Sequence, residues 1–368
     1  DPVAAMREAL EHPLDFPALR RALTPDDQVA IAIDEETPHL VALLVPLLEH
    51  IASARVKAEA ITLVCPPSST NQPWLDELPE EFEDVRVEVH QPADRKKLAY
   101  LATTRGGRRV YLNRTIVDAD QLVVLSRRGY DPLTGYAGAE MSLYPRLADE
   151  ATIRELEAEL DSAAPSSEPW PIQQEAREVA WLMGAAQFLV QVIDGADAGI
   201  ARIVTGSLES SDAGQRLLDE RWRVTCAEPA DVVIAPISGD ASKGSPGDLA
   251  RAFFAGARVV KPGGNIVVLS DIVPELGPGF QMFRRHDDPA LALRLLMTEK
   301  PRDLADAFMW ATAADQAKLY LLSGLESEIA EELFAIPMEQ ADQLRRLLGA
   351  QTTVTVLPDA HRTLAVLA

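Results

Sequence analysis

The chain has 368 residues, of which 47% are hydrophobic and 25% charged, which is ordinary for globular proteins and favours about two domains. Its formal net charge of −22, from 57 acidic and 35 basic residues, argues against nucleic acid and anionic membranes as partners, because both need a dense basic surface. The two cysteines, Cys65 and Cys226, are too few for a disulfide framework or a cysteine-based zinc site.

Strand-like apolar runs alternate with helical patterns through the first half of the chain. This alternation predicts α/β layers with a mainly parallel sheet. The predicted strands are residues 29–34, 60–65, 85–90, 110–113 and 121–126. The polar, Pro/Ser-rich stretch at 161–171 predicts a surface loop.

A second series of strands begins after Cys226, at residues 230–238, 265–271, 318–323 and 352–359. We therefore expect two α/β domains, residues 1–227 and 228–368. The last strand, about 352–368, is a candidate to pack back on the first domain. No apolar run approaches the roughly 20 residues of a membrane-spanning helix, and no signal-peptide pattern is present, so a cytoplasmic location is expected. The sequence leaves the oligomeric state open.

Common catalytic fingerprints are missing. The chain has no G-x-G-x-x-G after a strand, no P-loop and no G-x-S-x-G elbow. Its six histidines show no metal-ligand spacing, and His286 beside Asp287 and Asp288 fits a charged turn, so no metal site is predicted. The stretch "GARVVKPGGNIVVLSD" resembles part of a class I methyltransferase, but the glycine-rich loop for the methyl donor is missing upstream. This leaves methyltransferase as a minor alternative.

The stretch "GYAGAEMSLYPRLADEATI", residues 135–153, suggests a loop whose glycines let the backbone approach a ligand closely. In order along the chain, "VAIAIDEETP", this loop, "ADVVIAPISGD" and "VTVLPDAHRTLAVL" resemble phrases of the nickel-dependent lactate racemase family. The resemblance implies a site in the cleft between two domains. It also implies a nickel-pincer cofactor made from a pyridinium mononucleotide, tethered to a loop lysine, with histidines as nickel ligand and acid/base pair. The chemistry would be hydride abstraction from a 2-hydroxy acid and return to either face.

The family's functional positions are replaced in this sequence. The tethering lysine falls on Met141, the glycine before it on Ala139, and two histidines fall on Asp131 and Glu157. The family's Gly-Thr-His-Arg turn falls on residues 66–72, and its strand-end arginine falls near Pro38. Its Tyr-Gln-x-x-Lys motif falls on Gly247, Asp248 and Arg251. We therefore expect no nickel-pincer cofactor and no active pincer racemase.

Two function classes remain open. One is an enzyme with a different isomerase- or lyase-type chemistry on a hydroxy acid, in which Asp131 and Glu140 act as general acid and base. The other is a non-catalytic binding or regulatory protein that keeps the fold. In both cases a small carboxylate or other anion is the expected ligand. Its predicted contacts are Arg127, Arg128, Tyr130, Tyr136, Lys243 and Arg251, with Asp34 and Glu35 at the first strand end. The competing interpretation is that nearby carboxylates already neutralise these arginines.

Overall fold

The computed structural model describes residues 1–67, 72–160, 163, 165, 169–184, 186–196, 199–240 and 244–368. Its contacts divide the chain into two compact units. The first consists of Asp1–Leu156, Pro165–Gly195 and Gly199–Leu218, and the second chiefly of Asp219–Ala368. The division falls inside helix α7 (Ser211–Trp222), which is earlier than the boundary at 227/228 expected from the sequence. The predicted fold class, α/β with mainly parallel sheets, is confirmed.

The first unit is built on a sheet with the strand order β3-β2-β1-β6-β8-β9. Neighbours from β3 to β8 pair in parallel, and only β8 and β9 are antiparallel. The strands are β1 (Val29–Ile33), β2 (Ile61–Cys65), β3 (Arg86–Val89), β6 (Gln121–Asp131), β8 (Ala186–Asp194) and β9 (Ile200–Gly206). A parallel arrangement brings the carboxyl ends of β1, β2, β3, β6 and β8 to one edge of the sheet.

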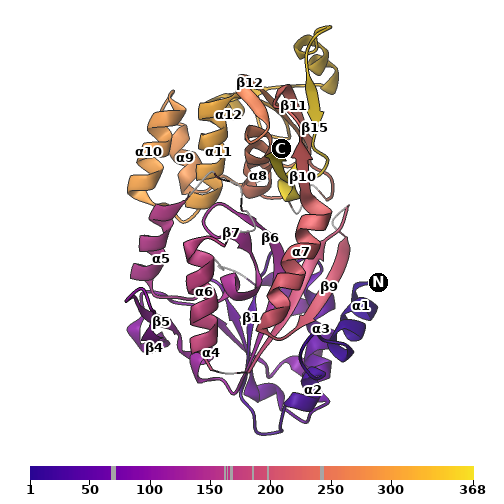
Figure 1. The fold of residues 1–368 in the computed structure, drawn as a ribbon, viewed down its shortest axis with the longest axis vertical. Helices are drawn as coiled ribbons and strands as arrows, with labels where there is room; N and C mark the ends of the chain where they lie inside the picture. The colour runs from indigo at the N-terminus through magenta and orange to yellow at the C-terminus, as the bar shows by residue number, and fades with distance from the viewer. Residues whose placement is uncertain are drawn as a thin grey trace. The chain divides into compact units, whose positions relative to one another are not determined.

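Side-chain alternation along β1 assigns the two faces of this sheet. Val29, Ile31 and Ile33 belong to a core that also contains residues of α1 (Pro2–Glu11) and α3 (Leu40–Ala52). Ala30 and Ala32 face the opposite core, which includes the loop after β6. Figure 1 shows the ribbon with these elements labelled. The other helices of this unit are α2 (Leu19–Ala22), α4 (Arg114–Asp118), α5 (Glu150–Leu156) and α6 (Pro171–Leu182).

The strand predicted at 110–113 is real but does not join the main sheet. It is part of β5 (Arg109–Asn113), which forms a separate antiparallel hairpin with β4 (Leu98–Thr103). The turn between them is tight: Thr104 N donates to Arg108 O at 2.9 Å, and Gly107 has a φ of +86°. Positive φ is readily adopted by glycine, so the local "RGG" sequence closes a hairpin rather than a crossover.

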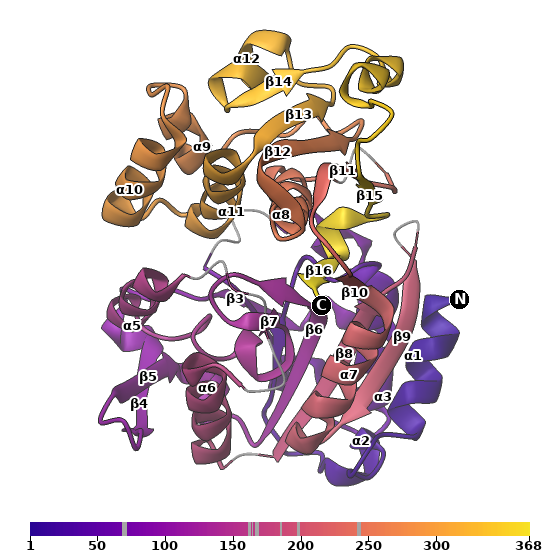
Figure 2. The same ribbon diagram turned by 45° about the horizontal axis from the view of Figure 1, so that its top comes forward.

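The second unit contains a parallel sheet in the order β14-β13-β12-β11-β15. Its strands are β11 (Ala230–Pro236), β12 (Val260–Leu269), β13 (Lys318–Leu322), β14 (Ala335–Pro337) and β15 (Val354–Val356). The helices are α8 (Pro246–Ala257), α9 (Pro278–Phe283), α10 (Pro289–Glu299), α11 (Leu304–Gln316) and α12 (Ser327–Glu332). Figure 2 shows α8 and α11 together beside this sheet, where they cover one of its faces.

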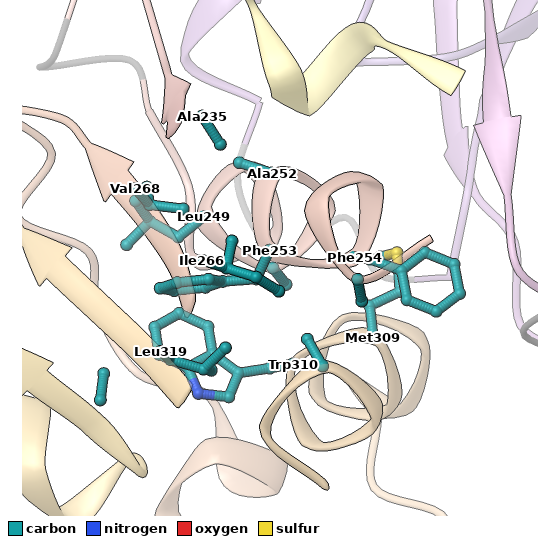
Figure 3. Packing of buried hydrophobic residues seen from close by; sticks show 14 of the residues in the cluster. Ala235, Leu249, Ala252, Phe253, Phe254, Ile266, Val268, Met309, Trp310 and Leu319 are labelled. Carbon is teal, nitrogen blue, oxygen red and sulfur yellow. The ribbon is translucent and has the colours of Figure 1, made fainter. Parts of the chain in front are cut away.

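Aromatic packing fixes α8 against α11. The rings of Phe253 and Trp310 meet edge to face with centroids 4.8 Å apart, and Trp310 Nε1 donates to Leu333 O at 2.6 Å. Figure 3 shows Trp310 beside Phe253 and Leu319 in this core. Because the indole N–H is satisfied, the large ring is buried without an unpaired donor.

The last strand, β16 (Leu364–Leu367), pairs in parallel with β10 (Arg223–Cys226). The sequence-based boundary places β10 in the first domain, whereas the contacts of the structure place it in the second unit. Cys65 on β2 is fully buried and Cys226 on β10 is half-buried, and both are free thiols. No helix within the described residues has the length and apolar character needed to cross a bilayer.

Candidate functional site

The glycine loop begins where β6 runs past the sheet into a hairpin with β7 (Gly135–Ala137). Asp131 closes this hairpin: its Oδ1 accepts hydrogen bonds from Leu133 N and Thr134 N, both at 2.8 Å, and from Thr134 Oγ1 at 3.1 Å. A carboxylate that accepts successive backbone amides in this way is a turn-forming group. Asp131, expected as a general acid or base, therefore has a structural role in this geometry.

Gly138 brings two stretches of backbone together. It has a φ of +82°, and a Cβ on this residue would lie 2.2 Å from Arg127 O. The next residue, Ala139, donates its N–H to Ser126 Oγ at 2.8 Å. The close approach that the glycines allow is thus used by the end of β6, within the protein itself.

Glu140 lies in the buried network that follows the loop and is only 3% exposed. Its Oε1 accepts from Arg177 Nε at 3.2 Å and its Oε2 from Ser211 Oγ at 2.5 Å. Arg177 also pairs with Asp212. Both oxygens of Glu140 are therefore engaged by protein donors, which leaves this carboxylate poorly placed to exchange a proton with a substrate.

Arg128 lies beside this network and is 3% exposed. Its Nη1 donates to Gly138 O at 3.0 Å. Burial lowers the pKa of Arg128, and the nearby Glu140 carboxylate opposes that effect. The side chain therefore fastens the loop to β6. Tyr130 and Tyr136 face each other across the hairpin with ring centroids 5.7 Å apart.

Met141, at the family's lysine position, is 6% exposed and packs in an apolar cluster. The cluster also contains Val110, Leu112, Tyr144, Ala148, Leu156, Ile172, Ala176 and Val179. A thioether among aliphatic and aromatic side chains is a core residue. These surroundings do not fit a covalently tethered cofactor, which would need an amine at this position.

The carboxyl ends of β1, β6 and β8 carry a group of ion pairs. Arg127 Nη2 lies 3.1 Å from Glu36 Oε2, and its Nη1 lies 3.5 Å from Asp194 Oδ2. Asp34 pairs with Arg146 at 3.6 Å. Burial alone would lower the pKa of Arg146, but Asp34, Glu36, Asp131 and Glu35 raise it. Sequence reasoning missed Arg146, although it lies inside the 135–153 stretch, because its pairing with Asp34 joins segments more than 100 residues apart.

Glu35 is engaged as well, since its Oε1 accepts from Trp74 Nε1 at 2.8 Å. The first strand end therefore holds acidic groups bound to protein partners. Of the two residues predicted there, Asp34 lies next to a cation and Glu35 next to an indole N–H. This arrangement fits the structural ion-pair interpretation better than an anion site.

In the second unit, Arg251 lies on α8 and pairs with Asp248 at 2.9 Å and with Asp306 at 3.9 Å. Burial by itself would raise the pKa of Asp248, but the charge of Arg251 outweighs it and the pKa is lowered. His361, 8% exposed, lies near both residues. Burial and the neighbouring Arg362 and Arg251 lower the pKa of His361 to about 3, so the imidazole is neutral at pH 7. Sequence reasoning missed His361 as a neighbour of α8 because the two are more than 100 residues apart along the chain.

Lys243 lies outside the residues that the structure describes, as does most of 66–72, the counterpart of the family's Gly-Thr-His-Arg turn. Glu157, at a family histidine position, belongs to a short 3-10 helix, Glu157–Glu159. Within the described ranges, no three His, Cys, Asp or Glu side chains are grouped so that they could hold a metal ion.

Residues 1–162 match the family model of the lactate racemase N-terminal domain. This part of the chain is therefore lactate racemase-like. The resemblance seen in the sequence is thereby confirmed at the level of the family, and the mainly parallel two-unit architecture agrees with it.

Two solved structures share the fold of this lactate racemase-like chain. The lactate racemase apoprotein of Thermoanaerobacterium thermosaccharolyticum is 18% identical, with a TM-score of 0.82 over 99% of this chain and 93% of its own. A protein of Thermotoga maritima is 11% identical, with a TM-score of 0.71 over 100% of this chain and 98% of its own. Among curated protein sequences, none matches the chain.

Proposed function

We propose that this lactate racemase-like protein does not carry out nickel-pincer racemisation and that its glycine loop has become a structural element. The observation that carries the proposal is the packing of Met141 in an apolar cluster at the lysine position. A thioether cannot form the amide link to the cofactor, and the residue at the nickel-ligand histidine position is Glu157. Nickel prefers imidazole and sulfur donors to a single carboxylate.

Of the two function classes, the contacts favour a non-catalytic protein that keeps the fold. The two candidate acid/base groups, Asp131 and Glu140, are occupied by hydrogen bonds to the protein. A different isomerase- or lyase-type reaction would need at least one of them to be released first. This supports a binding or regulatory role over catalysis.

Binding of a small anion to the predicted arginines is still a proposal. Such an anion would have to displace the protein carboxylates that already pair with them. An anion on Arg127 would compete with Glu36 and Asp194, and one on Arg251 would compete with Asp248. Arg128 is enclosed and bonded to the loop backbone. These contacts count against the predicted arginine set as the ligand contacts.

Two measurements test the proposal. Native mass spectrometry of the purified protein is expected to show neither nickel nor a covalent addition at residues 135–145. Circular dichroism of D-lactate and of L-lactate is expected to show no enzyme-dependent loss of optical activity, even with the cofactor-synthesis proteins supplied. An active lactate racemase treated identically is the positive control. Stoichiometric nickel or measurable racemisation would refute the proposal.

A further inference from the structure

A cavity of about 630 Å³ opens in the first unit, at the amino ends of β1, β2 and β3 beside α4. This volume is within the range of about 300–1,000 Å³ that is typical of small-molecule pockets. Val29, Ala30, Ala60 and Ala119 give the cavity an apolar part. Three of the four are alanines, whose short side chains leave room for a ligand beside them.

The cavity is separate from the strand ends that carry the family-like site. In this parallel sheet, Asp34, Arg127 and Asp194 lie at or just beyond the carboxyl ends, whereas Val29, Thr62 and Arg86 lie at the amino ends. A strand of five residues spans about 13–16 Å at about 3.3 Å per residue, so the two regions lie at opposite edges of the sheet. Neither the family match nor the ion-pair group accounts for this cavity.

The charged side chains that line the cavity have a net charge of +1. Arg86, Lys97 and Arg114 line it together with Glu88 and Asp118. Glu88 is already engaged: it accepts from Asn113 Nδ2 at 3.0 Å and from Thr115 Oγ1 at 2.8 Å, and Lys97 lies 3.9 Å away. In a chain of net charge −22, a cavity with three cations and two carboxylates stands out.

The two arginines differ from the paired arginines elsewhere in this unit. Arg114 donates from Nε to Lys96 O at 3.1 Å and from Nη2 to Leu98 O at 2.7 Å, which are neutral carbonyls. These bonds hold the guanidinium in place without cancelling its charge. For Arg86, the described residues provide no hydrogen bond or ion pair to its guanidinium. Guanidinium groups recognise carboxylate and phosphate through paired N–H donors.

We propose that this cavity binds a small organic anion, with one carboxylate or phosphate group held by Arg86 and Arg114 and a compact apolar body resting on Ala30, Ala60 and Ala119. The charge provides the attraction and the alanine-lined wall provides the selectivity for an organic anion over an inorganic one. Carboxylate and phosphate share this recognition chemistry, so the choice between them is left to the probes.

Isothermal titration calorimetry of the full chain at low ionic strength tests the proposal, because salt screens exposed guanidinium groups. The probes are benzoate and phenyl phosphate, which carry an apolar body, and acetate and inorganic phosphate, which do not. We expect saturable binding of benzoate or phenyl phosphate, and whichever binds more tightly identifies the acid group. The matching anion without an apolar group, acetate or inorganic phosphate, is expected to bind at least about tenfold more weakly.

Three variants assign the binding to the cavity. Arg86→Gln removes a charge and Ala119→Leu reduces the space without changing charge, and each is expected to weaken binding by about tenfold or more. Arg202→Gln, at an exposed arginine on β9 of the same unit, is the matched control and should change the Kd by less than about twofold. Thermal melts of all variants verify folding. The proposal is overturned if no probe binds saturably, or if binding survives both Arg86→Gln and Ala119→Leu.

Discussion

Ser211 donates a hydrogen bond of 2.5 Å to Glu140 across 71 residues of sequence, and both side chains are almost fully buried. This bond ties the glycine loop to the start of α7. Together with the pair between Arg177 and Glu140, it makes the carboxylate a structural acceptor shared by three elements.

Glu140→Ala is expected to destabilise the first unit. The substitution removes the acceptor for Ser211 and Arg177 and the charge that offsets the buried Arg128. We expect the free energy of unfolding to fall by about 2 kcal/mol. Urea denaturation followed by circular dichroism measures the change. The control is Glu150→Ala, which removes an exposed pair with Arg154 and should cost less than about 0.5 kcal/mol. Equal effects of the two substitutions would contradict a structural role for Glu140.

Met141→Lys is expected to destabilise the protein by about 3 kcal/mol or more at neutral pH, because it places an ammonium group in an apolar cluster. Burial would lower the pKa of that lysine below about 10.4, so the unfolded state would bind more protons and stability should rise with pH toward that value. Met141→Leu keeps the volume and should cost less than about 1.5 kcal/mol. A pH-independent, small effect of lysine would show that the side chain reaches solvent.

Gly138→Ala should be much more damaging than Gly184→Ala. Both glycines have positive φ, +82° and +64°, so alanine strains the backbone at each. Gly138 also has a ψ of 178°, which places it in a region adopted almost exclusively by glycine. At Gly138 the new Cβ would also meet Arg127 O at 2.2 Å, whereas nothing lies within 4 Å at Gly184. We expect a difference of at least about 2 kcal/mol between the two unfolding free energies. Similar values would mean that the loop after β6 adapts easily.

The buried His361 is expected to make the stability of the protein sensitive to acid. Its pKa is lowered to about 3 by burial and by Arg362 and Arg251, against about 6.5 in an unfolded chain. Between these values the unfolded state binds the extra proton, so stability from this group is present above pH 6.5 and is lost as the pH falls toward 3. Unfolding free energy should drop by about 1–2 kcal/mol between pH 6.5 and 5, on top of other groups. His361→Gln should make the unfolding free energy less dependent on pH between about pH 6.5 and 5. His12→Gln, at an exposed histidine, is the matched control and should leave this dependence unchanged. An unchanged slope in His361→Gln would contradict the assignment.

Much of the fold could be predicted because parallel strands between helices leave a clear periodic pattern. The runs at 29–34, 60–65, 121–126 and 265–271 correspond to β1, β2, β6 and β12. The strands β8 and β9 were not predicted. The apolar run of β8 follows closely on α6, and periodicity alone does not separate a buried strand from an adjoining helix.

The site was harder to predict because its contacts are between distant segments. The loop glycines and Glu140 could be selected from the sequence, but their partners Arg177 and Ser211 lie on elements with no distinctive motif. Arg127 was selected as a charge at a strand end and Arg251 as the one family-like position that keeps a positive charge. Only the folded structure shows the carboxylates of Glu36, Asp194 and Asp248 beside them. Charge type is visible in a sequence, whereas charge pairing is not.

The two free thiols differ in burial, and this difference makes one of them a natural reporter of unfolding. Burial raises the pKa of Cys65 to about 12, and it also raises the pKa of Cys226, which is less buried. Since only the thiolate reacts with alkylating reagents, Cys65 can be labelled at neutral pH only when the central sheet around β2 opens. Cys226, on β10, is only half-buried, so it can be labelled without the opening of a sheet. Differential alkylation followed by mass spectrometry would therefore record the opening of the central sheet through Cys65, with Cys226 as an internal reference in the unmodified chain.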